Sequence, residues 1–206
     1  MTLDHAGSRR RLALKDFFQG YKKLDKRNSE SMEKISFPLP AESTLFNFEK
    51  VSKRAHFDIA SVNSAIWITL DGGIMRQVHL SAGGVAPIPL YLSDTSHYST
   101  GRKPDIDTVR EAASIAQSEI SPIGDVRGSA VYKRLLPRQL IHAHFITLFP
   151  EKIPLEGLLD SSANTSSGNL QRNGKKYDSF LKSHFSPSLV LDSASPWRDD
   201  GQYPGW

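Results

Sequence analysis

Apolar and polar residues alternate with a period of two in the first half of the chain, a pattern typical of half-buried β-strands. The predicted strands with this alternation are residues 32–37, 44–51 and 74–82. Residues 59–70 are more continuously apolar, which predicts a strand that is covered on both faces. The sequence Asp71-Gly72-Gly73 lies between two of these strands and predicts a hairpin turn, because glycine readily adopts the positive φ that such turns need.

The second half of the chain changes to a helical period. Residues 106–120 place apolar side chains on one face, with Asp105 as the expected N-cap, and residues 126–149 continue in the same way. Pro137 lies inside the second pattern and is expected to kink the helix or to split it. The predicted fold class is therefore α+β, with an antiparallel three- to four-stranded sheet followed by a small helical bundle.

The last quarter of the sequence has a different composition. Residues 161–169 are polar and of low complexity, and the scattered apolar residues after Pro150 follow no sustained period. Segments of this kind cannot bury enough apolar surface to offset the entropy of ordering. We therefore expect an organised domain over residues 1–150 and a mostly disordered tail over residues 151–206.

Composition excludes several classes of site. The 206 residues include no cysteine, which rules out disulfides, thiolate metal sites and cysteine-ligated iron–sulfur clusters in this chain. The beginning of the chain has no apolar run long enough for a signal peptide or a membrane span. These observations predict a cytoplasmic protein without a membrane partner.

The positive charge is concentrated at the beginning of the chain. The net charge is +4, and residues 1–54 hold 12 Lys and Arg against 7 Asp and Glu. Such a basic segment is compatible with nucleic-acid binding, or with a solvated surface beside a site for a phosphate-bearing cofactor. The cations alternate with acids and no nucleic-acid motif accompanies them, so we expect no nucleic-acid partner.

The stretch FEKVSKRAHFDI, residues 48–59, carries the most suggestive chemistry. Lys50 lies near the end of a predicted strand, Lys53 and Arg54 follow it, and Asp58 precedes the next strand. A cationic loop at a strand end suits a site for an anionic ligand. The residue types alone support an anion or cofactor site and nothing narrower.

Four segments, in this order, resemble one family. They are LKDFFQGYKK at residues 14–23, FEKVSKRAHFDIASVN at residues 48–63, SAGGVAPIP at residues 81–89 and ISPIGDVRGSAVY at residues 120–132. Together they resemble the C-terminal half of the FAD-binding domain of molybdenum hydroxylases. This family includes the xanthine dehydrogenase small subunit and the carbon monoxide dehydrogenase medium (flavoprotein) subunit.

The resemblance implies an FAD site with four candidate residues. Lys50 matches a lysine that lies at the flavin in relatives, with a surface lysine at a strand end as the alternative. Arg54 and Asp58 match a loop beside the isoalloxazine ring, although Asp58 fits equally well as a cap that accepts hydrogen bonds from the loop backbone. Met32 matches an apolar position that touches FAD, but ordinary core packing is the favoured interpretation of this single residue.

The chain also departs from the family pattern. It has no glycine-rich segment to cradle the FAD diphosphate and no iron–sulfur domain. The resemblance therefore implies partners: an N-terminal FAD-binding half, an iron–sulfur domain and a large subunit with the molybdenum cofactor. With them the chain would contribute to a flavin site that passes electrons to NAD or another acceptor. By itself it is expected to be non-catalytic and to bind FAD weakly or not at all.

Two other interpretations remain open at this stage. The chain could be a truncated relic, or an assembly or interaction domain that keeps the fold without the cofactor. No metal site is expected, because His142 and His144 are two residues apart on a predicted helix and face different sides. No combination of serine, histidine and acid stands out for nucleophilic catalysis.

Overall fold

The computed structural model describes residues 1–37, 39–54 and 58–159. Its main element is a four-stranded antiparallel sheet in the order β6-β7-β8-β9. The strands are β6 (Thr44–Val51), β7 (Val62–Asp71), β8 (Ile74–Gly83) and β9 (Leu90–Tyr91). The predicted α+β class, with a sheet followed by helices, is confirmed. No helix in the part of the chain described is long and apolar enough to cross a membrane.

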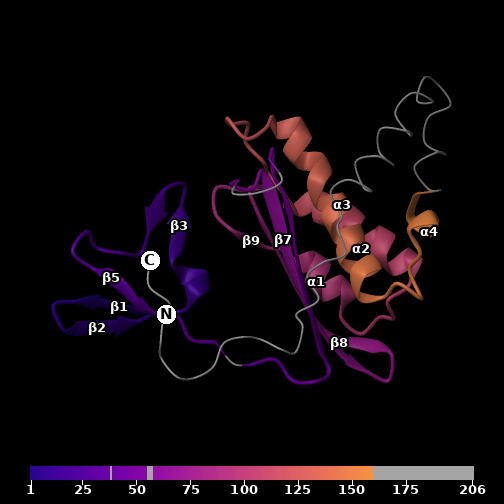
Figure 1. Ribbon diagram of the computed structural model, residues 1–206, viewed down its shortest axis with the longest axis horizontal. Coiled ribbons are helices and arrows are strands. Elements are labelled where there is room, and N and C mark those ends of the chain that lie inside the picture. Colours follow the sequence, from indigo (N-terminus) through magenta and orange to yellow (C-terminus); the bar gives the residue numbers. More distant parts are fainter. Residues whose placement is uncertain (38, 55–57, 160–206) are drawn as a thin grey trace. The chain divides into compact units, whose positions relative to one another are not determined.

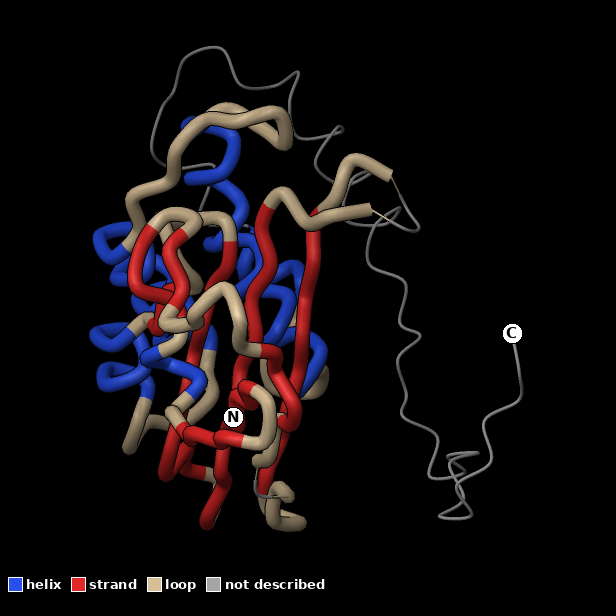
Figure 2. Tube along the Cα trace, turned by 90° about the vertical axis from the view of Figure 1, so that its left-hand side faces the viewer, coloured by secondary structure: helices blue, strands red, loops and turns tan. Residues whose placement is uncertain are grey.

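Helices cover one face of this sheet (Figures 1 and 2). They are α1 (Ser93–Ser99), α2 (Ile106–Glu119), α3 (Ala130–Leu148) and α4 (Leu155–Leu159). Helix α3 packs on β6 and β7, α1 packs on β8, and α2 contacts both of these helices. Along β7, alternate side chains are therefore buried, and in the described part of the chain no helix covers the other face of the sheet.

The exposure of side chains alternates along β7, as expected for a strand that is covered on one face. Val62, Ile66 and Ile68 are fully buried beneath the helices, whereas Ala65 and Trp67 on the opposite face are only half-buried. The expectation that residues 59–70 are covered on both faces is therefore wrong. Ala65 and Thr69 of β7 lie with Trp67 on the face that is partly open, whereas Ser64 is buried on the helix side.

The hairpin between β7 and β8 forms where the sequence predicted it. Gly72 and Gly73 have φ values of 58° and 76°. Two consecutive residues with positive φ are the signature of a type I′ turn, whose twist matches that of the strands it joins. The register shifts by one residue between Leu70 and Thr69, and beyond this irregularity Trp67 lies opposite His79.

The two long helices begin at polar caps. The side chain of Asp105 accepts a hydrogen bond from the Thr108 N–H (2.9 Å), as predicted, and starts α2. Helix α3 begins at Ala130 with Ser129 as its cap, four residues later than the apolar pattern suggested. Pro137 is buried inside α3 and does not split it, since a single helix continues to Leu148.

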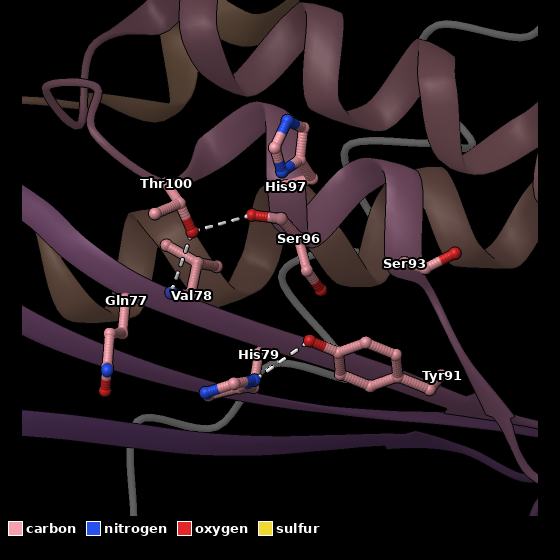
Figure 3. Close-up of a pocket in the computed structure, with 8 residues that line it drawn as sticks. All are labelled: Gln77, Val78, His79, Tyr91, Ser93, Ser96, His97 and Thr100. Atoms are coloured by element: carbon pink, nitrogen blue, oxygen red, sulfur yellow. Dashed lines mark hydrogen bonds between the residues drawn. The ribbon is translucent and has the colours of Figure 1, made fainter.

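Helix α1 closes the edge of β8, where β9 is too short to cover it. Its hydroxyl groups take the place of a neighbouring strand: the Val78 N–H donates to Thr100 Oγ1 (3.2 Å) and the Leu80 N–H donates to Ser96 Oγ (3.0 Å) (Figure 3). Further along, the Met75 N–H donates to the Arg102 carbonyl (2.9 Å). The polar sequence of α1 gave no periodic signal, and the sequence analysis missed this helix.

The segment after α3 is more ordered than the sequence suggested. Residue Ile153 is fully buried, α4 follows it, and the Gly157 carbonyl accepts a hydrogen bond from the Arg110 guanidinium (2.6 Å). Placing the beginning of a disordered tail at residue 151 is therefore wrong for residues 151–159. Residues 160–206, which include the rest of the predicted tail, lie outside the described part.

The N-terminal residues form two small sheets of their own. Strands β1 (Thr2–His5), β2 (Ser8–Arg11) and β5 (Ser31–Lys34) make a three-stranded sheet, and the short 3₁₀ helix η1 (Leu14–Asp16) leads to a pair formed by β3 (Phe18–Gly20) and β4 (Lys23–Leu24). Arg10 joins these elements by ion pairs to Glu30 (2.7 Å) and Asp25 (3.0 Å). The hydrogen bond from Arg10 and one from the Arg27 N–H lower the pKa of Glu30 to about 2.

The backbone approach at Gly84 yields a testable prediction. Gly84 and Gly101 have almost the same φ (+81° and +82°), but a Cβ at Gly84 would overlap the Ser61 carbonyl oxygen, whereas one at Gly101 would meet nothing within 4 Å. We expect Gly101→Ala to lower the free energy of unfolding by about 1 kcal/mol, because alanine disfavours the positive φ, and Gly84→Ala to lower it by about 3 kcal/mol. Urea denaturation of both variants measures the difference, and equal losses would contradict the close approach.

Candidate functional site

Three segments that are distant in sequence meet at one end of the main sheet. They are the end of β6 with the loop that follows it, the glycines that end β8, and the loop between α2 and α3. The Ser61 hydroxyl donates to the Arg127 carbonyl (2.8 Å), and the Ser121 N–H donates to the Val85 carbonyl (2.9 Å). Three of the four segments that carry the family resemblance are therefore neighbours in space.

Lys50 lies in the last row that spans β6, β7 and β8 at this end of the sheet. It pairs with Asn63 on β7, which in turn pairs with Gly83 on β8. Because β6 side chains alternate, Lys50 points to the face without helices, as do Phe46 and Phe48. Its side chain is exposed, and its ammonium donates to the Asp58 carbonyl oxygen at 3.3 Å.

The Asn63 side chain lies close against Gly83 in this row. A Cβ at Gly83 would come within 2.6 Å of the Asn63 side-chain oxygen. A larger residue would push Asn63 toward Lys50. The glycine pair therefore permits close approach of strand and loop.

Asp58 caps the loop that begins after β6. Its carboxylate accepts hydrogen bonds from the Arg54 N–H (2.9 Å) and the Ile59 N–H (2.9 Å), and the Arg54 guanidinium lies 3.6 Å away. These partners, chiefly the Arg54 N–H, lower the pKa of Asp58. The geometry matches the cap that was one of the two predicted roles of Asp58. Residues 55–57, where the chain departs from the family pattern, lie outside the described part.

A second cation joins the loop to the α2–α3 connection. The Lys53 ammonium donates to the Val126 carbonyl (2.7 Å). The connection itself is held by Lys133 of α3, whose side chain is only 3% exposed and forms an ion pair of 2.8 Å with Asp125. Asp125 also accepts the Arg127 N–H (2.8 Å), and these partners, Lys133 first, lower the pKa of its carboxyl group.

Asp125 and Arg127 are close in the sequence, but in the described part of the chain their side chains form no ion pair with each other. The carboxylate contacts the Arg127 backbone, and its charge is paired with Lys133. Sequence reasoning missed Lys133 and Lys53 as the residues that organise the loops. The eight-residue separation of Lys133 from Asp125 spans a loop and a helix start, so no local pattern indicates the pair.

The predicted site residues fall into two groups. The structure brings together Lys50, Arg54 and Asp58 at the end of the main sheet. Met32 lies on β5, in the N-terminal sheet, where its side chain is 43% exposed. Ordinary core packing, the favoured interpretation of Met32, does not describe a side chain with this exposure.

The charge of the site is positive. Lys50 and Lys53 are bound to carbonyl oxygens, so their charges are not neutralised by these contacts, and Arg54 is 76% exposed. The nearby acids are engaged with backbone N–H groups, with Arg54 or with Lys133. Such a cluster suits an anionic ligand. Over residues 1–37, 39–54 and 58–159, no group of three or more metal-ligating side chains is found.

The two histidines of α3 are not part of this cluster. His144 is fully buried against β6, where its Nδ1 accepts a hydrogen bond from the Asn47 amide (3.0 Å), and burial lowers its pKa to about 3. Burial, aided by the charges of Arg138 and Arg110, lowers the pKa of His142 to about 4. Both rings are therefore neutral at pH 7 and belong to the packing beneath the sheet.

A separate cavity of about 290 Å³ lies along the covered edge of β8. Its hydroxyl groups on Ser96 and Thr100 are already bonded to the strand, and His79 Nδ1 lies 2.9 Å from the Tyr91 hydroxyl (Figure 3). Of the other polar side chains of α1 that line it, Ser93 donates to Glu119 (3.4 Å), and His97 does not point toward His79 (Figure 3). None of the predicted site residues lines this cavity, and its polar groups mainly complete the sheet edge.

Removal of the Asp58 charge should destabilise the protein in a pH-dependent way. Because the folded-state pKa of Asp58 lies below its usual value of 3.8, the carboxylate contributes stability above about pH 4 and loses it as the pH falls through the lower folded value. Asp58→Asn should therefore unfold at a lower temperature than the unmodified chain at pH 7, and the difference should shrink in acid.

The matched control for this measurement is Glu111→Gln. Glu111 is an exposed residue of α2 that forms no hydrogen bond or ion pair with the residues described. Its replacement should leave the thermal midpoint nearly unchanged at each pH. If the difference in thermal midpoint between Asp58→Asn and the unmodified chain stayed constant down to pH 2, the capping role would be contradicted.

The buried ion pair gives a second prediction for this region. Asp125→Ala leaves the Lys133 ammonium with only the Ile123 carbonyl (3.1 Å) as a partner, which should cost about 2–3 kcal/mol because an almost fully buried charge loses its counterion. Lys133→Met removes the need for that counterion. In urea denaturation, the double variant should thus be less destabilised than the sum of the two single variants, and strict additivity would contradict the coupling.

Comparison with known proteins identifies the family. Residues 48–148 match the family described as the CO dehydrogenase flavoprotein C-terminal domain. The chain is 32% identical over 135 residues to the glyceraldehyde dehydrogenase medium chain of Sulfolobus acidocaldarius, a match that covers 65% of this chain and 47% of that protein. It is 29% identical over 129 residues to xanthine dehydrogenase 1 of Arabidopsis thaliana, covering 61% of this chain and 10% of that protein.

The fold is also that of a solved relative. The carbon monoxide dehydrogenase from Hydrogenophaga pseudoflava superimposes with a TM-score of 0.63 at 26% identity, over 68% of this chain and 48% of that chain. The chain thus spans about half the length of this structure and of the archaeal medium chain. The resemblance found in the four sequence segments is confirmed: residues 48–148 of this chain match the CO dehydrogenase flavoprotein C-terminal domain family.

Proposed function

We propose that this chain forms one side of an FAD site in a molybdenum hydroxylase-type oxidoreductase, with Lys50 as the cation at the flavin. The observation that carries the proposal is the position of Lys50. It is an exposed ammonium at the end of β6, on the face of the sheet without helices, inside the segment that matches the flavoprotein family. Arg54 and Asp58, on the loop that follows, are the other candidate neighbours of the cofactor.

The chemistry of these residues fits such a cofactor. FAD, when bound, would supply the transfer of electrons to NAD or another acceptor. The Lys50 ammonium would stabilise negative charge on the pyrimidine side of the ring, and favours the reduced form because its own charge is fixed. Phe48, which precedes it on the same face and is 51% exposed, offers an apolar surface next to this cation.

The surrounding loops hold Lys50 in place. Asp58 fixes the loop backbone, Lys53 binds it to the α2–α3 connection, and the pairing of Lys50 with Asn63 fixes the strand. A fixed cation stabilises charge more effectively than a mobile one, because it needs no reorganisation when that charge appears. We assign this positioning role to Lys53 and Asp58, and reserve direct contact for Lys50 and Arg54.

The proposal includes partners that complete the site. The residues of this chain supply cations and an apolar surface, and a glycine-rich segment that cradles a diphosphate is not found in its sequence. An N-terminal FAD-binding half, an iron–sulfur domain and a molybdenum-cofactor subunit would therefore act with it. The names of the relatives, medium chain and dehydrogenase, support an assembly of this kind.

FAD binding by the purified chain tests the proposal. Flavin fluorescence would be titrated with this chain alone and together with the separately expressed N-terminal half of a related flavoprotein. We expect quenching only with both parts present. Lys50→Ala should weaken the affinity for FAD roughly 10- to 100-fold, because a hydrogen bond to a charged group is lost. The same substitution should lower the reduction potential of the bound flavin.

Lys103→Ala is the matched control. Lys103 is an exposed lysine that adjoins Arg102, at the opposite end of the sheet from Lys50. Its removal changes the net charge equally and should leave both FAD affinity and potential unchanged. An equal loss of FAD affinity in both variants would mean that Lys50 acts only through the net charge of the chain. No binding under any of these conditions would leave the alternative, an assembly domain that keeps the fold without the cofactor.

A further inference from the structure

The two edges of the main sheet differ in whether their backbone groups have hydrogen-bond partners. The β8 edge is covered: hydroxyl groups of Ser96 and Thr100 accept its outward N–H groups, and the Arg102 backbone and β9 complete it. The other edge is β6, and within residues 1–37, 39–54 and 58–159 no strand pairs with its outer side. At eight residues β6 is long for an edge strand, and it contains neither proline nor glycine.

The hydrogen-bond phase of β6 shows which of its groups point outward. The Leu70 N–H donates to the Ser43 carbonyl (3.0 Å). Ser43 and Leu70 lie opposite each other when the β6–β7 register is continued by one pair beyond Thr44 and Thr69. Odd-numbered residues of β6 are therefore bonded to β7, and the backbone groups of Phe46, Phe48 and Lys50 face away from it. These three residues also carry their side chains on the face of the sheet without helices.

We propose that β6 is a self-association edge, on which a second copy of this chain pairs antiparallel with its two-fold axis at Phe48. The proposal does not depend on FAD binding. In this register Phe48 lies opposite the Phe48 of the second copy, and Phe46 lies opposite Lys50 in both directions. Six hydrogen bonds would join Phe46, Phe48 and Lys50 to their counterparts, and the two sheets would become one of eight strands.

The side chains favour this register over the two with the axis nearer the C-terminus. Phe46 opposite Lys50 sets an aromatic ring against an ammonium group, twice, and such a pair is attractive. On the helix side, Asn47 lies opposite Glu49, a pair without like charges; the Asn47 amide itself already donates to Glu49 of its own strand and to His144 Nδ1. Moving the axis one residue toward the C-terminus places Glu49 opposite Glu49, and moving it two residues places Lys50 opposite Lys50. Both shifts bring like charges together.

Exposure supports the same surface. The side chain of Phe46 is 57% exposed and that of Phe48 is 51% exposed. Two half-exposed phenylalanines on an open edge strand are an apolar surface that pairing would partly bury. Thr44, whose N–H is already bonded to the Ala41 carbonyl (2.9 Å), marks the end of the available edge. The proposed pairing therefore uses residues 46–50.

Sedimentation of the full chain over a wide concentration range tests the proposal, with two charge variants at one position. In this register, Phe46→Glu places a carboxylate opposite Lys50, and Phe46→Lys places a second ammonium there. We expect a dimer for the unmodified chain, an association within about threefold of it for Phe46→Glu, and one weakened at least about tenfold for Phe46→Lys. A monomer at every concentration, or equal weakening in both variants, would overturn the proposal.

Oxidative cross-linking provides an independent test, because the chain contains no cysteine. Opposite residues of a hydrogen-bonded antiparallel pair have Cα atoms about 5.5 Å apart, within the range of a disulfide. Phe48→Cys should therefore form a covalent dimer. In Phe46→Cys the substituted positions of the two copies would be four residues apart along the strands, about 13 Å, and should not cross-link. Cross-linking of both variants, or of neither, would contradict the register.

Discussion

The packing of Gly83 and Gly84 against Asn63 and Ser61 determines where the candidate site lies. Strand β8 ends against the segment that enters β7, so closely that a methyl group at Gly84 would overlap the Ser61 carbonyl. The same Ser61 donates its hydroxyl to the Arg127 carbonyl, which holds the α2–α3 connection against the strand ends. Because the β6–β7 register places Lys50 opposite Asn63, this contact also fixes the position of the exposed lysine.

The rest of the domain supports this end of the sheet from one side. Val62, Ile66 and Ile68 of β7 form a continuous buried row with α3, whose Leu140, Ile141 and Phe145 are also fully buried. Apolar burial of this kind is the main stabilising contribution in a domain of this size. Helices on a single face leave the opposite face open to a ligand or to another protein surface, and Lys50, Phe48 and Trp67 all lie there.

The sequence predicted the parts of the fold that follow from periodicity. Strand β6, the turn at Gly72 and Gly73, and the Asp105 cap of α2 were found because alternation, positive φ and N-capping are local. Helix α1 was missed because its buried residues are Thr95, Ser96 and Ser99, which carry no apolar signal. Their hydroxyl groups are needed for the edge of β8, a requirement that exists only once the sheet is formed.

The same distinction applies to the candidate site. Lys50, Arg54 and Asp58 occupy one local stretch, and the structure keeps them together at the end of β6. The contacts that hold this stretch come from far away in the sequence: Lys53 binds the Val126 carbonyl, and Lys133 compensates Asp125. No periodic or motif signal could have paired them, because each pair depends on how the α2–α3 connection folds over the strand ends.

The nature of these partners explains why the site remains cationic. Lys50 and Lys53 bind carbonyl oxygens, which satisfy an ammonium donor without cancelling its charge. Asp58 and Asp125 are directed instead toward backbone N–H groups, with Arg54 and Lys133 beside them, and these contacts favour their ionised forms while occupying their oxygens. If both lysines were paired with these carboxylates instead, the charges of Lys50 and Lys53 would be compensated and those of Arg54 and Lys133 would not. The hydrogen bonds of the loop hold it in shape and leave the lysine charges available to an anionic ligand.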